Sequence, residues 1–146
     1  MKRLKKQSLK QVRKLALELG RKALKRDLII GLVGPLGSGK TTFTKSLAKV
    51  LGITRVTSPT FIILSRYLRH PRSFYHLDFY RLNKLGQLDV LGLDEIINSK
   101  NRTVVIEWID KFPGLKKGCD IIIKFKINPD HTRDVTIHPQ TKNFVY

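Results

Sequence analysis

The sequence predicts an α/β fold with a mostly parallel sheet, and three observations support this class. A short apolar run at residues 28–33 leads into a glycine-rich turn and then into an amphipathic stretch, which is typical of a strand–loop–helix unit. Two further apolar runs, at 103–109 and 121–127, have the length and composition of buried strands. The 146 residues, 41% of them hydrophobic, suit a single domain over 1–146 with a real core.

The N-terminal region predicts a basic helix over residues 8–26. Its apolar residues recur at intervals of three and four, namely Leu9, Val12, Ala16, Leu19 and Ala23. Ser8, with Gln11 three positions later, has the pattern of a capping box at the start of that helix. Residues 1–7 lie before the cap and are expected to be disordered.

The remaining elements follow from residue type and turn signals. A helix is expected after the glycine-rich turn, ending at Gly52. Residues 61–67 and 74–80 are rich in β-branched and aromatic residues and flank a turn at 69–73, which predicts an antiparallel hairpin. A short helix is expected at 91–98, a loop at 112–120, and two more strands at 121–127 and 133–138 around a turn. The hairpins supply edge strands beside the parallel ones.

The charge is the unusual number in the composition. Twenty-nine Lys and Arg against eleven Asp and Glu give a net charge of +18, and eleven of those cations lie in residues 1–26. Such a balance favours a polyanionic partner, with a solvated basic helix face as the alternative. The single cysteine, Cys119, excludes an internal disulfide and is expected to be a core or loop thiol. No apolar signal-peptide core or membrane-length run is present, so a cytoplasmic location is expected.

The glycine-rich turn carries the main chemical signal. It follows the pattern G-x4-G-K-T, with the candidate binding residues Gly34, Pro35, Leu36, Gly37, Ser38, Gly39, Lys40, Thr41 and Thr42. Glycines let backbone amides approach phosphate oxygens, and the following helix directs its N-terminus at the same anion. The lysine then reaches the β- and γ-phosphates and the threonine hydroxyl is placed to ligate Mg²⁺. This pattern predicts a three-layer P-loop NTPase core that binds a nucleotide such as ATP together with Mg²⁺.

Two carboxylates are candidates for the rest of the site. Glu107 ends an apolar strand, which is where the second magnesium-holding carboxylate of a P-loop protein usually lies. Asp78 interrupts an aromatic strand, and an acid there is costly unless it has a partner. It could orient water, act as a base or join the metal shell, and the alternative is a turn cap or an ion pair with Arg81.

With these residues in place, the sequence resembles the TsaE (YjeE) family, the ATPase subunits of the bacterial machinery that makes threonylcarbamoyladenosine in tRNA. The matching stretches are residues 34–53, 56–67, 74–82, 91–97 and 104–110. The resemblance implies binding of ATP with Mg²⁺, slow hydrolysis, and assembly with TsaB and TsaD. The basic N-terminal helix adds tRNA as a possible partner, met directly or through the complex.

The resemblance also implies roles for individual residues. Lys40 would hold the phosphates and act in catalysis, Thr41 and Glu107 would serve the magnesium, and Asp78 would act near the γ-phosphate. The segment Ser58-Pro59-Thr60 matches a nucleotide-sensing switch, and Trp108 and Arg133 match residues near the nucleotide. Pro35 departs from the pattern, because the family usually has an acid there.

Two other functions remain open on the sequence alone. A small-molecule or nucleoside kinase would share the phosphate loop, with Arg66, Arg69 and Arg72 as a possible lid. A basic RNA-binding protein with a regulatory nucleotide site would explain the charge. The four histidines, His70, His76, His131 and His138, lack metal-ligand spacing and are expected to be ordinary surface or strand residues.

Overall fold

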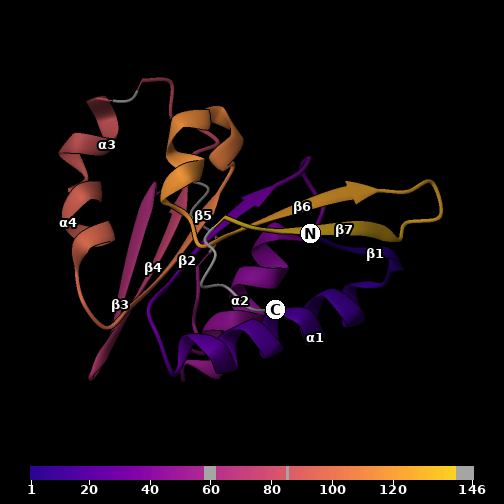
Figure 1. The fold of residues 1–146 in the computed structure, drawn as a ribbon, viewed down its shortest axis with the longest axis horizontal. Helices are drawn as coiled ribbons and strands as arrows, with labels where there is room; N and C mark the ends of the chain where they lie inside the picture. The colour runs from indigo at the N-terminus through magenta and orange to yellow at the C-terminus, as the bar shows by residue number, and fades with distance from the viewer. Residues whose placement is uncertain (58–61, 85, 141–146) are drawn as a thin grey trace.

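The computed structural model describes residues 1–57, 62–84 and 86–140, which form seven strands, four α-helices and two 3-10 helices (Figure 1). In chain order the elements are β1 Lys2–Gln7, α1 Leu9–Ala23, β2 Leu28–Val33, α2 Lys40–Val50, β3 Leu64–Arg69, β4 Arg72–Asp78, α3 Gly86–Val90, α4 Leu93–Asn98, β5 Arg102–Glu107, η1 Ile109–Lys111, η2 Pro113–Gly118, β6 Ile121–Ile127 and β7 Arg133–Pro139. None of the described helices is long and apolar enough to cross a membrane.

A single seven-stranded sheet organises the chain, in the order β1-β7-β6-β2-β5-β4-β3. The four central strands, β6, β2, β5 and β4, run parallel to one another. The outer strands are antiparallel, with β7 and β1 at one edge and β3 at the other. The expected α/β class is therefore confirmed, with the parallel part confined to the centre and antiparallel hairpins at both edges.

Both faces of the sheet are covered at its centre, which gives three layers (Figure 1). Alternate residues of β2 point to opposite sides, so that Leu28, Ile30 and Leu32 join the apolar cluster beneath α1 and α2. Ile29 joins the other cluster, which includes residues of α3 and α4. Burial on both faces explains why this strand is a continuous apolar run rather than an alternating one.

The expected disorder of residues 1–7 is wrong. Lys2–Gln7 forms β1, which pairs antiparallel with β7 in a register that sets Leu4 opposite Val135. Leu4 packs against the core, and Val135 is buried. Pairing with an edge strand satisfies the backbone of a segment whose basic side chains stay in solvent. Directly after it, α1 begins at the expected cap, where Ser8 and Gln11 form a capping box.

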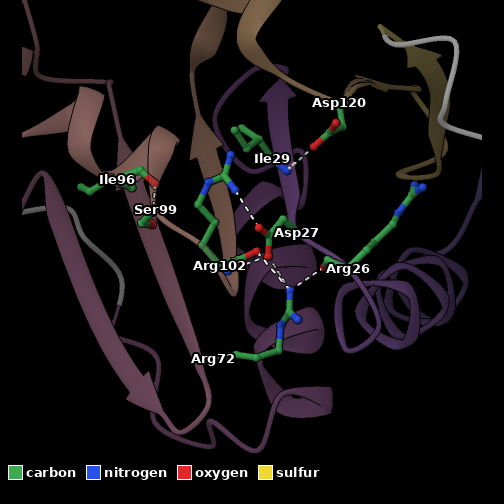
Figure 2. Close-up of polar contacts among 8 residues, drawn as sticks. All are labelled: Arg26, Asp27, Ile29, Arg72, Ile96, Ser99, Arg102 and Asp120. Carbon is green, nitrogen blue, oxygen red and sulfur yellow. Dashed lines mark hydrogen bonds and ion pairs between the residues drawn. The ribbon is translucent and has the colours of Figure 1, made fainter.

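The amino-terminal edge of the parallel strands is held together by acidic side chains (Figure 2). Asp27 lies 3.0 Å from Arg72 and 3.0 Å from Arg102, the first residues of β4 and β5. Its Oδ1 also accepts the Arg102 amide at 2.9 Å. Asp120 accepts the Ile29 amide at 2.8 Å and so joins the start of β6 to β2. These contacts tie β4, β5 and β6 to the start of β2 at the amino-terminal edge. None of these contacts involves the carboxyl ends of the strands.

The position of the β3–β4 hairpin tests the arginine lid that the kinase alternative would need. Arg69 and Arg72 are paired residues of the β3–β4 hairpin at the amino-terminal edge. Since β4 runs from Arg72 to Asp78, strand rise places this hairpin about 20 Å from the carboxyl edge. Arg72 is already engaged with Asp27. The structure therefore does not support an arginine lid from these residues over the phosphate loop.

Cys119 is buried in the core, as expected. Burial, with a smaller effect of the adjacent Asp120 carboxylate, raises the pKa of its thiol to about 12. The side chain therefore behaves as a small apolar group rather than as a nucleophile.

Candidate functional site

The glycine-rich loop joins the carboxyl end of β2 to the N-terminus of α2, at the edge of the sheet where ligands of parallel α/β proteins bind. Gly34 has a φ of 153°, and a Cβ on it would lie 2.7 Å from the carbonyl oxygen of Phe125. Gly39 has a φ of 105° and is the N-cap of α2. Both glycines of the motif are therefore required by the backbone.

The N-terminus of α2 fits an anionic group. No side chain caps it, and the Phe43 amide donates to the Gly39 carbonyl at 2.8 Å as the first bond of the helix. The amides of residues 40–42 precede this bond and have no acceptor within the helix. By contrast, α1 is closed by its capping box. An anion placed before α2 would accept hydrogen bonds from these amides and would be stabilised by the positive end of the helix dipole.

Lys40 is the buried cation of the site, only 4% exposed. Its Nζ donates to the carbonyl oxygens of Gly34 at 2.7 Å and Pro35 at 2.9 Å, and it lies 3.9 Å from the centre of the Trp108 ring. Burial lowers the pKa of Lys40, whereas the Glu107 and Asp78 carboxylates act in the opposite direction. Both of these carbonyl acceptors are neutral, so a phosphate oxygen would gain a charged donor without first breaking an ion pair to it.

Glu107 is the buried carboxylate, 2% exposed, at the end of β5. Its Oε2 accepts the Thr41 hydroxyl at 3.0 Å, and its Oε1 lies 2.8 Å from His76 Nε2 and 3.2 Å from the Thr44 hydroxyl. Carboxylate and hydroxyl oxygens are ligands that Mg²⁺ prefers. The Thr41–Glu107 pair thus offers two oxygen atoms of the kind that Mg²⁺ takes as ligands, and binding of the ion by this pair stays a prediction.

His76 is a site residue that the sequence reasoning missed. It was expected to be an ordinary strand residue, yet it is fully buried and its only described polar contact is with Glu107. The available signal was the spacing His76-x-Asp78, because residues two apart in a strand share a face. Parallel pairing of β4 with β5 then brings that face to Glu107.

Asp78 lies beside Glu107, because the two are paired residues of the parallel strands β4 and β5. Its Oδ1 accepts the Tyr80 amide at 2.9 Å, so the turn-cap role considered for it is present. Burial raises the pKa of Asp78, and the Glu107 charge adds to the rise, while the Tyr80 amide and Lys40 oppose it. Asp78 also lines a cleft over the glycine-rich loop, so capping the turn does not remove it from the site.

These groups line a cleft of about 350 Å³ over the loop. The predicted residues in its lining are Leu36, Gly37, Ser38, Gly39, Lys40, Thr41, Thr42, Asp78, Glu107, Trp108 and Arg133. Gly34 and Pro35 are not in the lining and instead accept hydrogen bonds from Lys40. Leu9 and Tyr80 line the cleft without having been predicted. The proposed switch, Ser58-Pro59-Thr60, lies outside the described residues.

Two side chains reach the cleft from opposite flanks. Trp108 has a φ of 60°, an uncommon value for a residue with a side chain, and its ring lies 5.0 Å from that of Tyr80. Arg133, the first residue of β7, donates to the carbonyl oxygens of Ser38 at 3.3 Å and Gly37 at 3.4 Å. A tryptophan strained at the end of β5 and an arginine against the loop are both positioned to contact a bound ligand.

The strand–loop–helix unit at the carboxyl edge of a parallel sheet defines the class, an α/β protein with a phosphate-loop motif. Sequence comparison then gives the family. The sequence model of "Threonylcarbamoyl adenosine biosynthesis protein TsaE" matches residues 6–135, so the chain belongs to the TsaE family.

Individual relatives and a solved structure agree with this family. The tRNA threonylcarbamoyladenosine biosynthesis protein TsaE of Aquifex aeolicus is 34% identical over 128 residues, which cover 86% of each chain. The protein of the same name from Borreliella burgdorferi is 42% identical over 80 residues, or 55% of this chain and 58% of that protein. The crystal structure of Bacillus subtilis YdiB superposes with a TM-score of 0.71 at 27% identity, covering 96% of this chain and 84% of that one.

The contact between His76 and Glu107 predicts a loss of stability in His76→Ala. The substitution removes a donor from a buried carboxylate, which costs about 2 kcal/mol. Urea unfolding followed by the fluorescence of Trp108, the single tryptophan, measures the change. His76→Gln retains a donor and should recover part of the loss. Equal stability of His76→Ala and the parent would show that the hydrogen bond contributes nothing.

The environment of Asp78 predicts a pH-dependent gain of stability in Asp78→Asn. Because the folded-state pKa is raised above the ordinary 3.8, the parent loses stability as pH rises through the folded value. Asn carries no charge and can still accept the Tyr80 amide. Asp78→Asn should therefore melt at a higher temperature than the parent at pH 7, and the difference should shrink below pH 4. A difference that does not vary with pH would contradict this explanation.

Proposed function

We propose that this protein has a P-loop NTPase core that binds ATP with Mg²⁺ and hydrolyses the nucleotide slowly in support of tRNA threonylcarbamoyladenosine synthesis. The observation that carries the proposal is the uncapped N-terminus of α2, with Lys40 on one side of it and the Thr41–Glu107 pair on the other. Membership of the TsaE family and the names of the relatives support the biosynthetic role. A role in tRNA modification supports a cytoplasmic location, which is part of the proposal.

Different residues of the cleft would contact different parts of a triphosphate. The amides at the start of α2 and the Lys40 ammonium bind phosphate oxygens, with Lys40 exchanging its two carbonyl acceptors for them. Thr41 and Glu107 would hold Mg²⁺, which would neutralise part of the negative charge of the phosphates. Arg133 borders the loop and adds a second cation. Trp108 and Tyr80 form an apolar wall of the cleft.

Asp78 is the group best placed to act on water. It lines the cleft one strand away from Glu107, and its raised pKa makes it a stronger base than an exposed aspartate. The Tyr80 amide fixes one carboxylate oxygen and leaves the other for a water molecule. Its role is to orient that water toward the γ-phosphate and accept its proton. Glu107, whose two oxygens are engaged by side chains, is the less suitable base.

The nucleotide part of the proposal predicts that Lys40→Ala lowers the kcat/KM for ATP by at least about 100-fold, the effect of removing one preorganised donor. Lys45→Ala is the matched control, because Lys45 is an exposed lysine of the same helix. Glu107→Gln should raise the Mg²⁺ concentration needed for half-maximal activity. Phosphate release measures hydrolysis, and quenching of Trp108 fluorescence measures binding. Unchanged hydrolysis by Lys40→Ala would refute the site.

The biosynthetic part predicts association with TsaB and TsaD proteins of the same genome. Tagged protein should retain both partners when ATP and Mg²⁺ are present, and Lys40→Ala should retain less of them than the parent. Lys45→Ala should behave as the parent does. Retention of neither partner under any nucleotide condition would separate this protein from that assembly, even if its ATPase activity were intact.

A further inference from the structure

The nucleotide site leaves most of the +18 charge unexplained. The sequence assigned the N-terminal excess to a helix, but the structure divides it among β1, α1 and the turn that follows α1. Of the eleven cations in residues 1–26, four belong to β1, namely Lys2, Arg3, Lys5 and Lys6. These residues lie in a strand that pairs with β7, which in turn pairs with β6.

The strand register gathers cations on one side of this three-stranded unit. Arg3 and Lys124 are both paired with Thr136 of the intervening β7, so the three side chains form one row across the strands. Lys126 is paired with Asp134, two residues along. Neighbouring strands are about 4.8 Å apart, so the cations of the row lie within about 10 Å of one another at the backbone.

The row faces away from the core. Leu4, Val135 and Phe125 occupy the alternate positions of the same three strands and belong to the core cluster beneath α1. Arg3, Lys124 and Lys126 are exposed on the opposite face. In Figure 1 the helices α3 and α4 lie at the other end of the sheet from β1 and β7. We term this outer face, around Arg3, Lys124 and Lys126, the basic sheet face, and all three residues belong to the lining of a groove of about 240 Å³.

The charge of the basic sheet face is poorly compensated. Asp134 is the acid in the lining of the groove, and its Oδ1 is engaged by the Lys6 amide and by Asn128 Nδ2, each at 2.9 Å. His138 continues this side of β7, and its pKa is lowered by burial and by the charges of Lys124 and Arg3. Like charges at neighbouring positions of a sheet are unfavourable. A bound polyanion would relieve that repulsion.

We infer that the basic sheet face, around Arg3, Lys124 and Lys126, binds the phosphodiester backbone of RNA. The inference rests on the proposed function in tRNA modification for the identity of the polyanion. The groove offers guanidinium, ammonium and hydroxyl donors, which are the groups that contact phosphate. Phe125, the aromatic residue of its lining, is packed in the core rather than available for stacking on bases. The contact should therefore depend on charge and not on base sequence.

Salt-dependent binding of an unmodified tRNA transcript tests the inference. The double variant Arg3→Gln/Lys124→Gln should bind about tenfold more weakly than the parent at physiological salt. The slope of log K against log salt should also fall by about 1.8, because each lost phosphate contact removes about 0.9. Lys10→Gln/Lys14→Gln is the matched control, because it removes two exposed cations from α1. This control should bind as the parent does.

Several outcomes would overturn the inference. These are absence of tRNA binding by the parent, a salt-independent affinity, an equal loss in both double variants, or a loss confined to the helix variant. Competition by polyglutamate as effective as that by tRNA would assign the face to an acidic protein instead. A third variant, Lys124→Gln/Lys126→Gln, leaves β1 intact and should also bind weakly, which guards against loss of the β1–β7 pairing. Nucleotide binding, read from Trp108, should be unchanged in all of them, so failure here is distinct from failure of the ATPase proposal.

Discussion

The burial of the Glu107 carboxylate is the constraint on which the arrangement of the site depends. A charged group at 2% exposure is tolerated only when donors surround it. Those donors come from separate elements, with Thr41 and Thr44 on α2 and His76 on β4. The carboxylate therefore links the loop helix to two neighbouring strands, and the same contacts that make its burial possible hold it beside Thr41 at the start of α2.

Both edges of the parallel strands carry acidic and basic side chains, but these side chains are paired differently at each edge. At the amino-terminal edge, Asp27 is paired with the guanidinium groups of Arg72 and Arg102, so its charge is balanced within this cluster (Figure 2). At the carboxyl edge, Asp78 and Glu107 lie side by side, and the nearby Lys40 binds carbonyl oxygens instead. Within the described parts of the chain, the carboxylate at the amino-terminal edge is thus paired with arginines, whereas the lysine at the carboxyl edge donates to neutral carbonyl groups.

Local signals in the sequence were sufficient for the loop, for β2 and α2, and for the capping box at Ser8, because each depends on neighbouring residues. The family resemblance named Trp108 and Arg133 as residues near the nucleotide, and both line the cleft, while their contact with a nucleotide stays a prediction. The sequence failed where long-range pairing decides. Lys2–Gln7 lacks the alternating pattern of a strand and becomes one only because β7 offers an open edge. His76 joins the site through the register of β4 and β5, which no local pattern encodes.

Strand β7 belongs to both charged regions of the molecule. Arg133 reaches the phosphate loop on one face, while the adjacent Asp134 points to the basic sheet face on the other, as alternation along a strand requires. A single residue step thus separates the nucleotide cleft from the proposed RNA contact. Pairing on both sides, with β1 and with β6, fixes which residues of the strand lie on each face. The cations of the basic sheet face therefore lie on the opposite side of β7 from Arg133 and outside the lining of the cleft over the phosphate loop.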